Sequence, residues 1–262
     1  MEKTKANNKS HKNTPIKLYG LIGYPLSHSF SPAYFADKFL KEGILNSSYK
    51  LFPLESIEAF TDLIIDHPEL KGLNVTIPYK QAVIPYLLEL DEAAKAIGAV
   101  NTICFTGNGL IGHNTDWLGF RDSIQPLLKP HHKKALVLGT GGSSKAVHYA
   151  LEQMGIQSAS VSRTAAEHVD FTYQDIDPAV LEEYHIIVNT TPLGMTPDRL
   201  SRPDIPYHIL SEKHLLFDLV YNPEKTVFLI KGEKAGALYK NGLEMLHFQA
   251  EQAWAIWNKD KK

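Results

Sequence analysis

A lysine and an aspartate in the first half of the chain have the side chains that a proton transfer needs. Lys80 closes the segment Asn74-Val-Thr-Ile-Pro-Tyr-Lys80, and Asp116 closes Asn114-Thr-Asp116. An ammonium group hydrogen-bonded to a carboxylate is an acid–base couple that can protonate a reacting oxygen. The alternative for Asp116 is a plain helix cap, because an acid is favourable at the start of a helix. We predict that Lys80 and Asp116 meet in space and share the proton chemistry.

The segment before Lys80 carries polar side chains on one face of a predicted strand, residues 72–77. Asn74 and Thr76 share this face, whereas the opposite face is apolar until Pro78 ends the strand. A buried polar group without a partner costs roughly 1–3 kcal/mol, so polar residues in such a strand need a reason. The pattern favours a hydrated ligand pocket at the end of the strand.

Two serines and a glutamine are further candidates for contacts with a ligand. Ser29 and Ser31 are two residues apart, so in an extended chain both hydroxyls face one way and can hold a carboxylate. The alternative is that Ser-x-Ser-Pro simply caps a helix. Gln249 lies at the edge of the apolar stripe of a predicted helix, 243–257, where it faces either a buried partner or water.

A glycine-rich turn stands between a predicted strand and a predicted helix in the sequence Leu136-Val-Leu-Gly139-Thr-Gly-Gly-Ser-Ser144. This is the context of a dinucleotide-binding turn. Gly139 would permit the tight turn, Gly141 would let the backbone approach a pyrophosphate, and Ser144 is small enough for close helix–strand packing. The helix N-terminus would offer free N–H groups to the phosphates. The alternative is an ordinary strand-to-helix turn.

The next predicted strand ends at Ser162-Arg163-Thr164, where enzymes that use NAD usually carry an acid for the ribose 2′-hydroxyl. An arginine at this place suits the 2′-phosphate of NADP. A solvated surface arginine is the alternative. We predict NADP as the cofactor.

The composition is that of a globular protein with a small-molecule partner. Of 262 residues, 44% are apolar and 21% are charged, and the net charge of −2 gives no field that would attract nucleic acid. The single cysteine, Cys104, suits a reducing compartment, so we expect a cytoplasmic protein. We also expect no membrane span, no metal centre, and a tail without function at residues 1–15.

Alternating predicted strands and helices place the chain in the α/β class with a largely parallel sheet. From Lys134 a new strand–helix series begins, which resembles a Rossmann-type doubly wound dinucleotide-binding domain. We predict two domains, an α/β substrate domain of residues 16–116 with 242–262 and a cofactor domain of residues 117–241. The C-terminal helix is expected to return to the first domain.

Seven motifs, in this order, are similar to those of the shikimate dehydrogenase family, and the similarity runs from about residue 17 to residue 257. They are His28-Ser-Phe-Ser-Pro, Asn74-Val-Thr-Ile-Pro-Tyr-Lys80, Gly98-Ala-Val-Asn101-Thr, Asn114-Thr-Asp116, Gly139-Thr-Gly-Gly, Asn189-Thr-Thr-Pro-Leu-Gly-Met195 and Asp218-Leu-Val-Tyr221-Asn-Pro. The resemblance implies reduction of 3-dehydroshikimate to shikimate with NADPH, in the pathway to chorismate and the aromatic amino acids.

The resemblance also implies roles for individual residues. It gives the proton transfer to Lys80, with Asp116 as its partner. The substrate residues that it implies are Ser29, Ser31, Asn74, Thr76, Lys80, Asn101, Asp116, Tyr221 and Gln249. The cofactor residues that it implies are Gly139, Thr140, Gly141, Gly142, Ser143, Ser162, Arg163, Thr164, Leu219, Gly242 and, more loosely, Glu92.

Position 167 departs from the family pattern. An arginine or lysine often follows the Asn-Arg-Thr clasp by three residues, whereas this chain has Glu167 there, so one phosphate-binding cation is missing. Two alternatives stay open on the sequence alone. One is a quinate/shikimate dehydrogenase that uses NAD, and the other is a non-catalytic dinucleotide-binding sensor that kept the fold. We expect a monomer or a homodimer.

Overall fold

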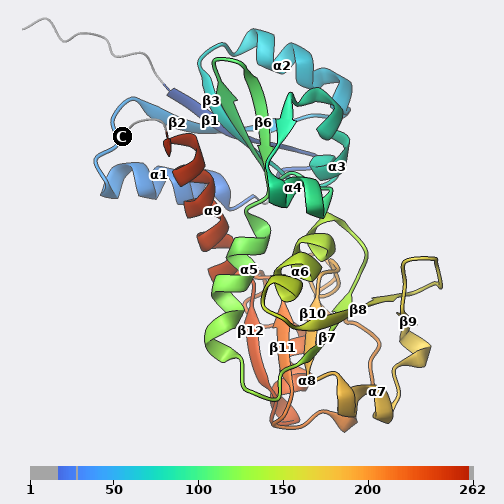
Figure 1. Cartoon of the computed structure of the whole chain (residues 1–262). Helices are drawn as coiled ribbons and strands as arrows, with labels where there is room; N and C mark the ends of the chain where they lie inside the picture. Colours follow the sequence, from blue (N-terminus) through green and yellow to red (C-terminus); the bar gives the residue numbers. More distant parts are fainter. Residues whose placement is uncertain (1–16, 28, 260–262) are drawn as a thin grey trace, which may run out of the picture.

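The computed structural model describes residues 17–27 and 29–259, and it arranges them around two six-stranded sheets that lie one above the other in Figure 1. The predicted tail at residues 1–15 and His28 of the first serine motif lie outside the described residues. We call the part that contains the first sheet the first half and the part that contains the second sheet the second half.

The first half contains a mixed sheet with strand order β2-β1-β3-β5-β6-β4. Its elements are β1 (Lys17–Gly23), α1 (Ser31–Lys41), β2 (Ser47–Pro53), α2 (Phe60–Asp66), β3 (Leu70–Val75), α3 (Tyr79–Ala82), β4 (Glu89–Leu90), α4 (Glu92–Ile97), β5 (Thr102–Thr106) and β6 (Gly109–His113). Strand β1 pairs in parallel with β2 and β3, whereas β5 is antiparallel to β3 and β6. The prediction of a largely parallel sheet holds for three of the five strand pairings in this half. The two-residue turn between β5 and β6 can join only antiparallel strands, which makes the sheet mixed.

The second half contains a parallel sheet with strand order β12-β11-β10-β7-β8-β9. Its elements are α5 (Asp116–Ile124), β7 (Lys134–Leu138), α6 (Gly142–Gln153), β8 (Gln157–Ser162), β9 (Phe171–Thr172), α7 (Pro178–Glu183), β10 (Ile186–Asn189), β11 (Leu215–Asp218), α8 (Val227–Lys234) and β12 (Leu238–Asn241). Numbered from β7, this is the 3-2-1-4-5-6 order of the doubly wound nucleotide-binding fold. The predicted Rossmann-type fold is confirmed.

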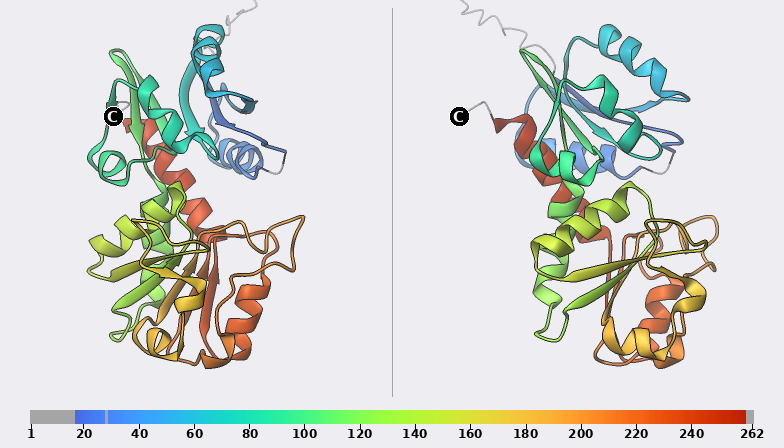
Figure 2. Two further views of the ribbon diagram at one scale, coloured as in Figure 1. Left: turned by 90° about the vertical axis from the view of Figure 1, so that its right-hand side faces the viewer. Right: turned by 45° about the vertical axis from the view of Figure 1, so that its right-hand side comes forward.

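The central strand β7 shows why the second half is layered on both sides. Its residues alternate between two cores, since Ala135 and Val137 pack in the cluster of Phe120, whereas Leu136 and Leu138 pack in the cluster of Phe228. A strand that is buried on both faces reads as a continuous apolar run, as residues 135–138 of β7 do. Helices therefore cover both faces of the sheet, which Figure 2 shows from two sides.

The last helix, α9 (Leu243–Trp257), leaves the second half and ends against the first sheet, as predicted. The Trp257 indole donates a hydrogen bond to the Ile103 carbonyl at 3.0 Å, and a side chain at Gly72 would collide with this indole. On its way α9 crosses α5 closely, because a Cβ at Gly119 would lie 2.6 Å from the Met245 carbonyl oxygen. The two helices thus join the halves.

Several expected bounds differ from the structure. The sequence favours one helix over residues 116–128, but α5 ends at Ile124, because Pro126 belongs to the 3₁₀ turn Gln125–Leu127 that follows it. Other 3₁₀ turns are Ile57–Ala59, Ile84–Tyr86, Tyr173–Asp175 and Tyr207–Ile209. The sequence pattern predicts no helix at α7 or α8 and no strand at β12.

Two histidines are buried where strands of the second sheet begin. His132 precedes β7 and His214 precedes β11, and the exposed fractions of their side chains are 3% and 4%. In each ring Nδ1 accepts a backbone N–H, from Lys129 at 3.0 Å and from Ser211 at 3.1 Å. Burial lowers the pKa of both imidazoles. Both rings are therefore neutral and accept through Nδ1. A proton on Nδ1 would face the backbone N–H that donates to it and would break this hydrogen bond.

We expect these histidines to make the second half sensitive to acid. Their pKa is lower in the folded protein than in the unfolded chain, so their contribution to stability is present above about pH 6.5 and is lost as the pH falls. Between the pKa of the unfolded chain and that of the folded protein, each pH unit changes the free energy of unfolding by at most about 1.4 kcal/mol per histidine. Urea unfolding at about pH 7.5 and about pH 5.5 should show a smaller loss for His132→Asn/His214→Asn than for the wild type. Equal losses in the two proteins would contradict this assignment.

Candidate active site

Lys80 and Asp116 meet, as the sequence hypothesis requires. Lys80 lies in the short helix α3 directly after β3, and Asp116 is the first residue of α5. The Lys80 Nζ donates to Asp116 Oδ2 at 2.6 Å, and the two side chains are 13% and 9% exposed. An ion pair this short and this shielded from water holds one ammonium group in a fixed direction.

Asn101 orients the carboxylate of this pair. Its amide donates to Asp116 Oδ1 at 2.8 Å, and its Oδ1 accepts the Thr115 backbone N–H at 2.7 Å. The same amide lies 3.4 Å from Gln249 Oε1, which brings α9 to the site. Since Lys80 bonds the other oxygen, both oxygens of Asp116 have a donor.

Asn74 is buried and hydrogen-bonded to other groups of the first half. Its Oδ1 accepts from the Tyr49 hydroxyl at 2.8 Å, and its amide donates to the Asn101 carbonyl at 3.3 Å and to Thr102 Oγ1 at 3.2 Å. Burial raises the pKa of the Tyr49 hydroxyl, and the nearby Ser31 side chain opposes this shift. Asn74 therefore has partners within the protein, and the ligand pocket beside it stays a prediction.

The serine segment lies against a loop of the second half. Phe30, between Ser29 and Ser31, packs edge-on against the ring of Tyr221, with the ring centroids 6.2 Å apart. Tyr221 follows β11, so this contact crosses between the halves. Thr76 lies just beyond the end of β3. Its methyl group lies so close to Gly23 that a side chain at position 23 would collide with it.

The glycine-rich turn lies between β7 and α6, where the order of the second sheet reverses. Gly139 has φ +112°, which favours glycine, and its carbonyl accepts from Ser144 Oγ at 2.7 Å. Gly141 precedes the first residue of α6. Ligands of doubly wound sheets bind at this point, at the carboxyl ends of the strands.

The ion pair lies beside this turn. Lys80 Nζ donates to Ser143 Oγ at 3.1 Å, and a Cβ built at Gly142 would lie 3.4 Å from Lys80 Cβ. Lys80 of the first half and the glycine-rich turn of the second half are thus in direct contact.

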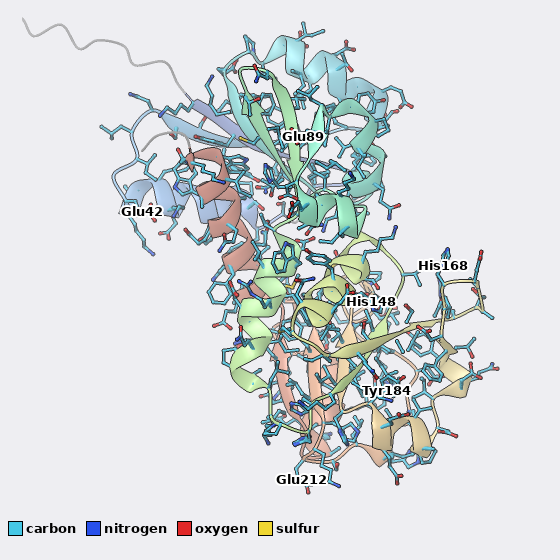
Figure 3. The ribbon with its side chains drawn as sticks, in the orientation of Figure 1. Glu42, Glu89, His148, His168, Tyr184 and Glu212 are labelled. Carbon is cyan, nitrogen blue, oxygen red and sulfur yellow. The ribbon has the colours of Figure 1, made fainter. Side chains whose placement is uncertain are left out.

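The other predicted cofactor residues lie at several edges of this region. Gly242 abuts Leu219, because a Cβ at Gly242 would collide with the Leu219 carbonyl, and Gly242 N donates to the Val220 carbonyl at 3.3 Å. Ser162 is the last residue of β8, and the exposed Arg163 and Thr164 follow it in a loop whose tip carries His168 (Figure 3). Glu92 begins α4 with an exposed side chain. Contacts of these residues with the cofactor stay predictions.

Within residues 17–27 and 29–259, no group of three or more histidine, cysteine, aspartate and glutamate side chains is arranged to hold a metal ion. The same part of the chain has no helix whose length and apolar character would let it cross a membrane.

Comparisons with known proteins agree with this geometry. Residues 21–103 match the family model described as the shikimate dehydrogenase substrate binding domain. A "Shikimate dehydrogenase (NADP(+))" from Caldicellulosiruptor saccharolyticus is 36% identical, over 92% of this chain and 91% of the relative. The crystal structure of shikimate dehydrogenase from Aquifex aeolicus is similar with a TM-score of 0.83, at 34% identity over 94% of each chain. That of the Thermus thermophilus enzyme with NADP(H) and shikimate has a TM-score of 0.83, at 30% identity over 93% of this chain and 94% of that one.

Asp218 is a buried carboxylate at the end of β11. It begins the last of the seven motifs, but the sequence indicates no function for it. Asp218 Oδ1 accepts from the Asn189 amide at 2.9 Å and from Val220 N at 3.0 Å, and Oδ2 accepts from Thr226 Oγ1 at 2.5 Å. Burial raises the pKa of this carboxyl to about 6. Asp218 thus ties β10, the loop to Tyr221 and the cap of α8 together. Three donors around one aspartate are a signal that only the folded chain reveals.

We expect Asp218→Ala to lower the free energy of unfolding by about 2–5 kcal/mol, because it leaves three buried donors without an acceptor. Asp218→Asn is the matched variant. It should cost less, since its amide oxygen can keep the bonds from Asn189 and Val220 while the Thr226 hydroxyl turns to accept. Urea unfolding of the three proteins measures the difference. Equal stability of the alanine and asparagine variants would show that the hydrogen bonds do not matter.

Proposed function

The chain belongs to the shikimate dehydrogenase family, and from this premise we propose how its own residues carry the reaction. It is an NADP-dependent oxidoreductase that reduces 3-dehydroshikimate to shikimate, a step toward chorismate and the aromatic amino acids. The observation that supports our assignment of roles is the hydrogen bond from Lys80 to Asp116 beside the turn at Ser143. A non-catalytic sensor is not favoured, because the relatives are named as enzymes.

The glycine-rich turn fits the pyrophosphate of NADP. A Cβ built at Gly141 would meet no described atom within 4 Å, so the space beside this residue is open. The first N–H groups of α6 have no partner within the helix and can donate to phosphate oxygens. We propose Gly139, Thr140, Gly141, Gly142 and Ser143 as the residues that hold the pyrophosphate. NADPH, when bound, supplies the hydride to the C3 carbonyl carbon.

Lys80 supplies the proton in our mechanism. One N–H bond of its ammonium group breaks as the C3 oxygen, which becomes negative when the carbon receives the hydride, takes the proton. Asp116 holds the ammonium group in the direction of that oxygen and balances its charge in a site shielded from water. In shikimate oxidation the same amine accepts the proton.

The substrate residues are proposed from the same arrangement. Ser29, Ser31 and Tyr221 would contact the carboxylate end of the substrate, and the contact of Phe30 with Tyr221 supports a shared location. The residues proposed to surround the ring hydroxyls are Asn74, Thr76, Lys80, Asn101, Asp116 and Gln249. Their support is the hydrogen-bond network that joins Asn74, Asn101 and Gln249 to the ion pair.

We propose that the remaining cofactor contacts come from Ser162, Arg163 and Thr164 at the 2′-phosphate and from Leu219, Gly242 and Glu92 near the nicotinamide.

The proposed domains are residues 16–116 with 242–262 and residues 117–241, which agrees with the division of the strands between two sheets. A cytoplasmic location and a monomer or homodimer are also proposals. The first is supported by a sequence with one cysteine.

Lys80→Ala should lower kcat by about 10²–10⁴-fold, because the positioned proton donor is lost. Shikimate should still bind, since the serines and asparagines remain. NADPH formation from shikimate and NADP⁺ measures turnover, and calorimetry measures binding. Lys71→Ala, which removes an exposed lysine from the neighbouring strand β3, is the control and should behave as the wild type. Unchanged turnover of Lys80→Ala in a folded protein would remove Lys80 from the mechanism.

Glu167→Arg should raise the preference for NADP over NAD about tenfold, which corresponds to about 1.4 kcal/mol. The exposed Glu167 places a negative charge where the family often has a cation for the 2′-phosphate. The ratio of kcat/KM for the two cofactors, with shikimate and with quinate, measures the effect. Glu212→Arg makes the same charge change before β11, away from the loop of His168 (Figure 3). An equal change in both variants would contradict a local role for position 167.

A further inference from the structure

Ser143 makes a contact with the proton donor that crosses between the halves. Its Oγ accepts the hydrogen bond from Lys80 Nζ at 3.1 Å. Ser143 belongs to the first turn of α6 in the second half, whereas Lys80 belongs to α3 in the first half. The side chain of Ser143 is half-buried, so this bond is partly shielded from water.

The position of this ammonium group is electrostatically unusual. The N-terminus of a helix carries a positive partial charge that favours anions and disfavours cations. Helix α6 has 12 residues, and the carbon chain of Lys80 passes beside its first residue, Gly142. The Ser143 hydroxyl lies in the first turn of this helix and accepts a hydrogen bond from the ammonium group. It therefore gives Lys80 an acceptor where the helix itself offers only donors.

We propose that Ser143 is a positioning residue for Lys80, and that its hydroxyl couples the cofactor turn to the proton donor. This inference rests on the proposed function of Lys80. Of the three donors of the ammonium group, one bonds Asp116, one bonds Ser143, and the third is assigned to the C3 oxygen of the substrate. Two fixed bonds determine the direction of the third.

The hydroxyl of Ser143 can serve both partners at once. Its oxygen accepts from Lys80, and its own proton can donate to a phosphate oxygen of the cofactor at the same helix end. Alanine at this position would remove both bonds, whereas threonine would keep the hydroxyl. These two substitutions therefore separate the hydroxyl from the shape of the turn.

Ser143→Ala should lower kcat about tenfold and leave the KM for shikimate within about twofold, because the serine guides the ammonium group rather than the substrate. Ser143→Thr should restore most of kcat. The control is Ser158→Ala, which removes another hydroxyl bonded to an ionisable side chain, His148 at 2.7 Å, from strand β8. Melting temperatures establish that all variants fold.

A second measurement uses the protein without cofactor or substrate. Acetylation of Lys80 by acetic anhydride, followed by mass spectrometry, should be faster in Ser143→Ala than in the wild type by about threefold, because the amine loses one of two fixed bonds. Ser143→Thr and Ser158→Ala should react as the wild type. An unchanged kcat in Ser143→Ala, or a loss confined to the KM for NADP⁺, would overturn the inference. If Lys80→Ala itself keeps full turnover, the proposed function of Lys80 fails instead.

Discussion

The ion pair of Lys80 and Asp116 is the interaction on which the site depends. Removing two charges from water is costly, and the pair is stable only if the remaining hydrogen-bonding capacity of both groups is used. Neutral partners use it here, since Asn101 bonds the second carboxylate oxygen and Ser143 bonds the ammonium group. The charge of the site is therefore carried by one ammonium group and one carboxylate, and the neutral groups around them fix their directions.

The scaffold places this pair by joining two sheets through two helices. Helix α5 begins at Asp116 and continues into the core of the second half, where Phe120 meets Phe217 with ring centroids 4.9 Å apart. Helix α9 crosses α5 at Gly119 and ends with Trp257 against the first sheet. The crossing needs a glycine because a side chain there would collide with the backbone of α9. The carboxylate is thus fixed to both halves at once.

Local patterns in the sequence predicted the parts of the molecule that local physics determines. The apolar strand before Gly139, the glycine-rich turn and the doubly wound order that follows could all be predicted, because burial on both faces and a tight turn leave direct traces in the residues. Gly107 and Asn108 form the turn of the antiparallel hairpin of β5 and β6, which makes the first sheet mixed. The short helices α7 and α8 span few turns and gave little periodicity. The bonds of Asn74 to Tyr49 and of Lys80 to Ser143 depend on distant segments, which no local pattern describes.

A series of hydrogen bonds runs from Tyr49 in β2 to the ion pair. Tyr49 bonds Asn74, Asn74 bonds the Asn101 backbone, and Asn101 bonds Asp116 at the start of α5. Burial raises the pKa of the Tyr49 hydroxyl, so it remains a neutral donor in this series. These bonds join the polar groups of the first sheet to Asp116, the partner of Lys80. Asp116 begins α5 and Ser143 lies in the first turn of α6, so both hydrogen bonds of the Lys80 ammonium group cross from the first half to the second.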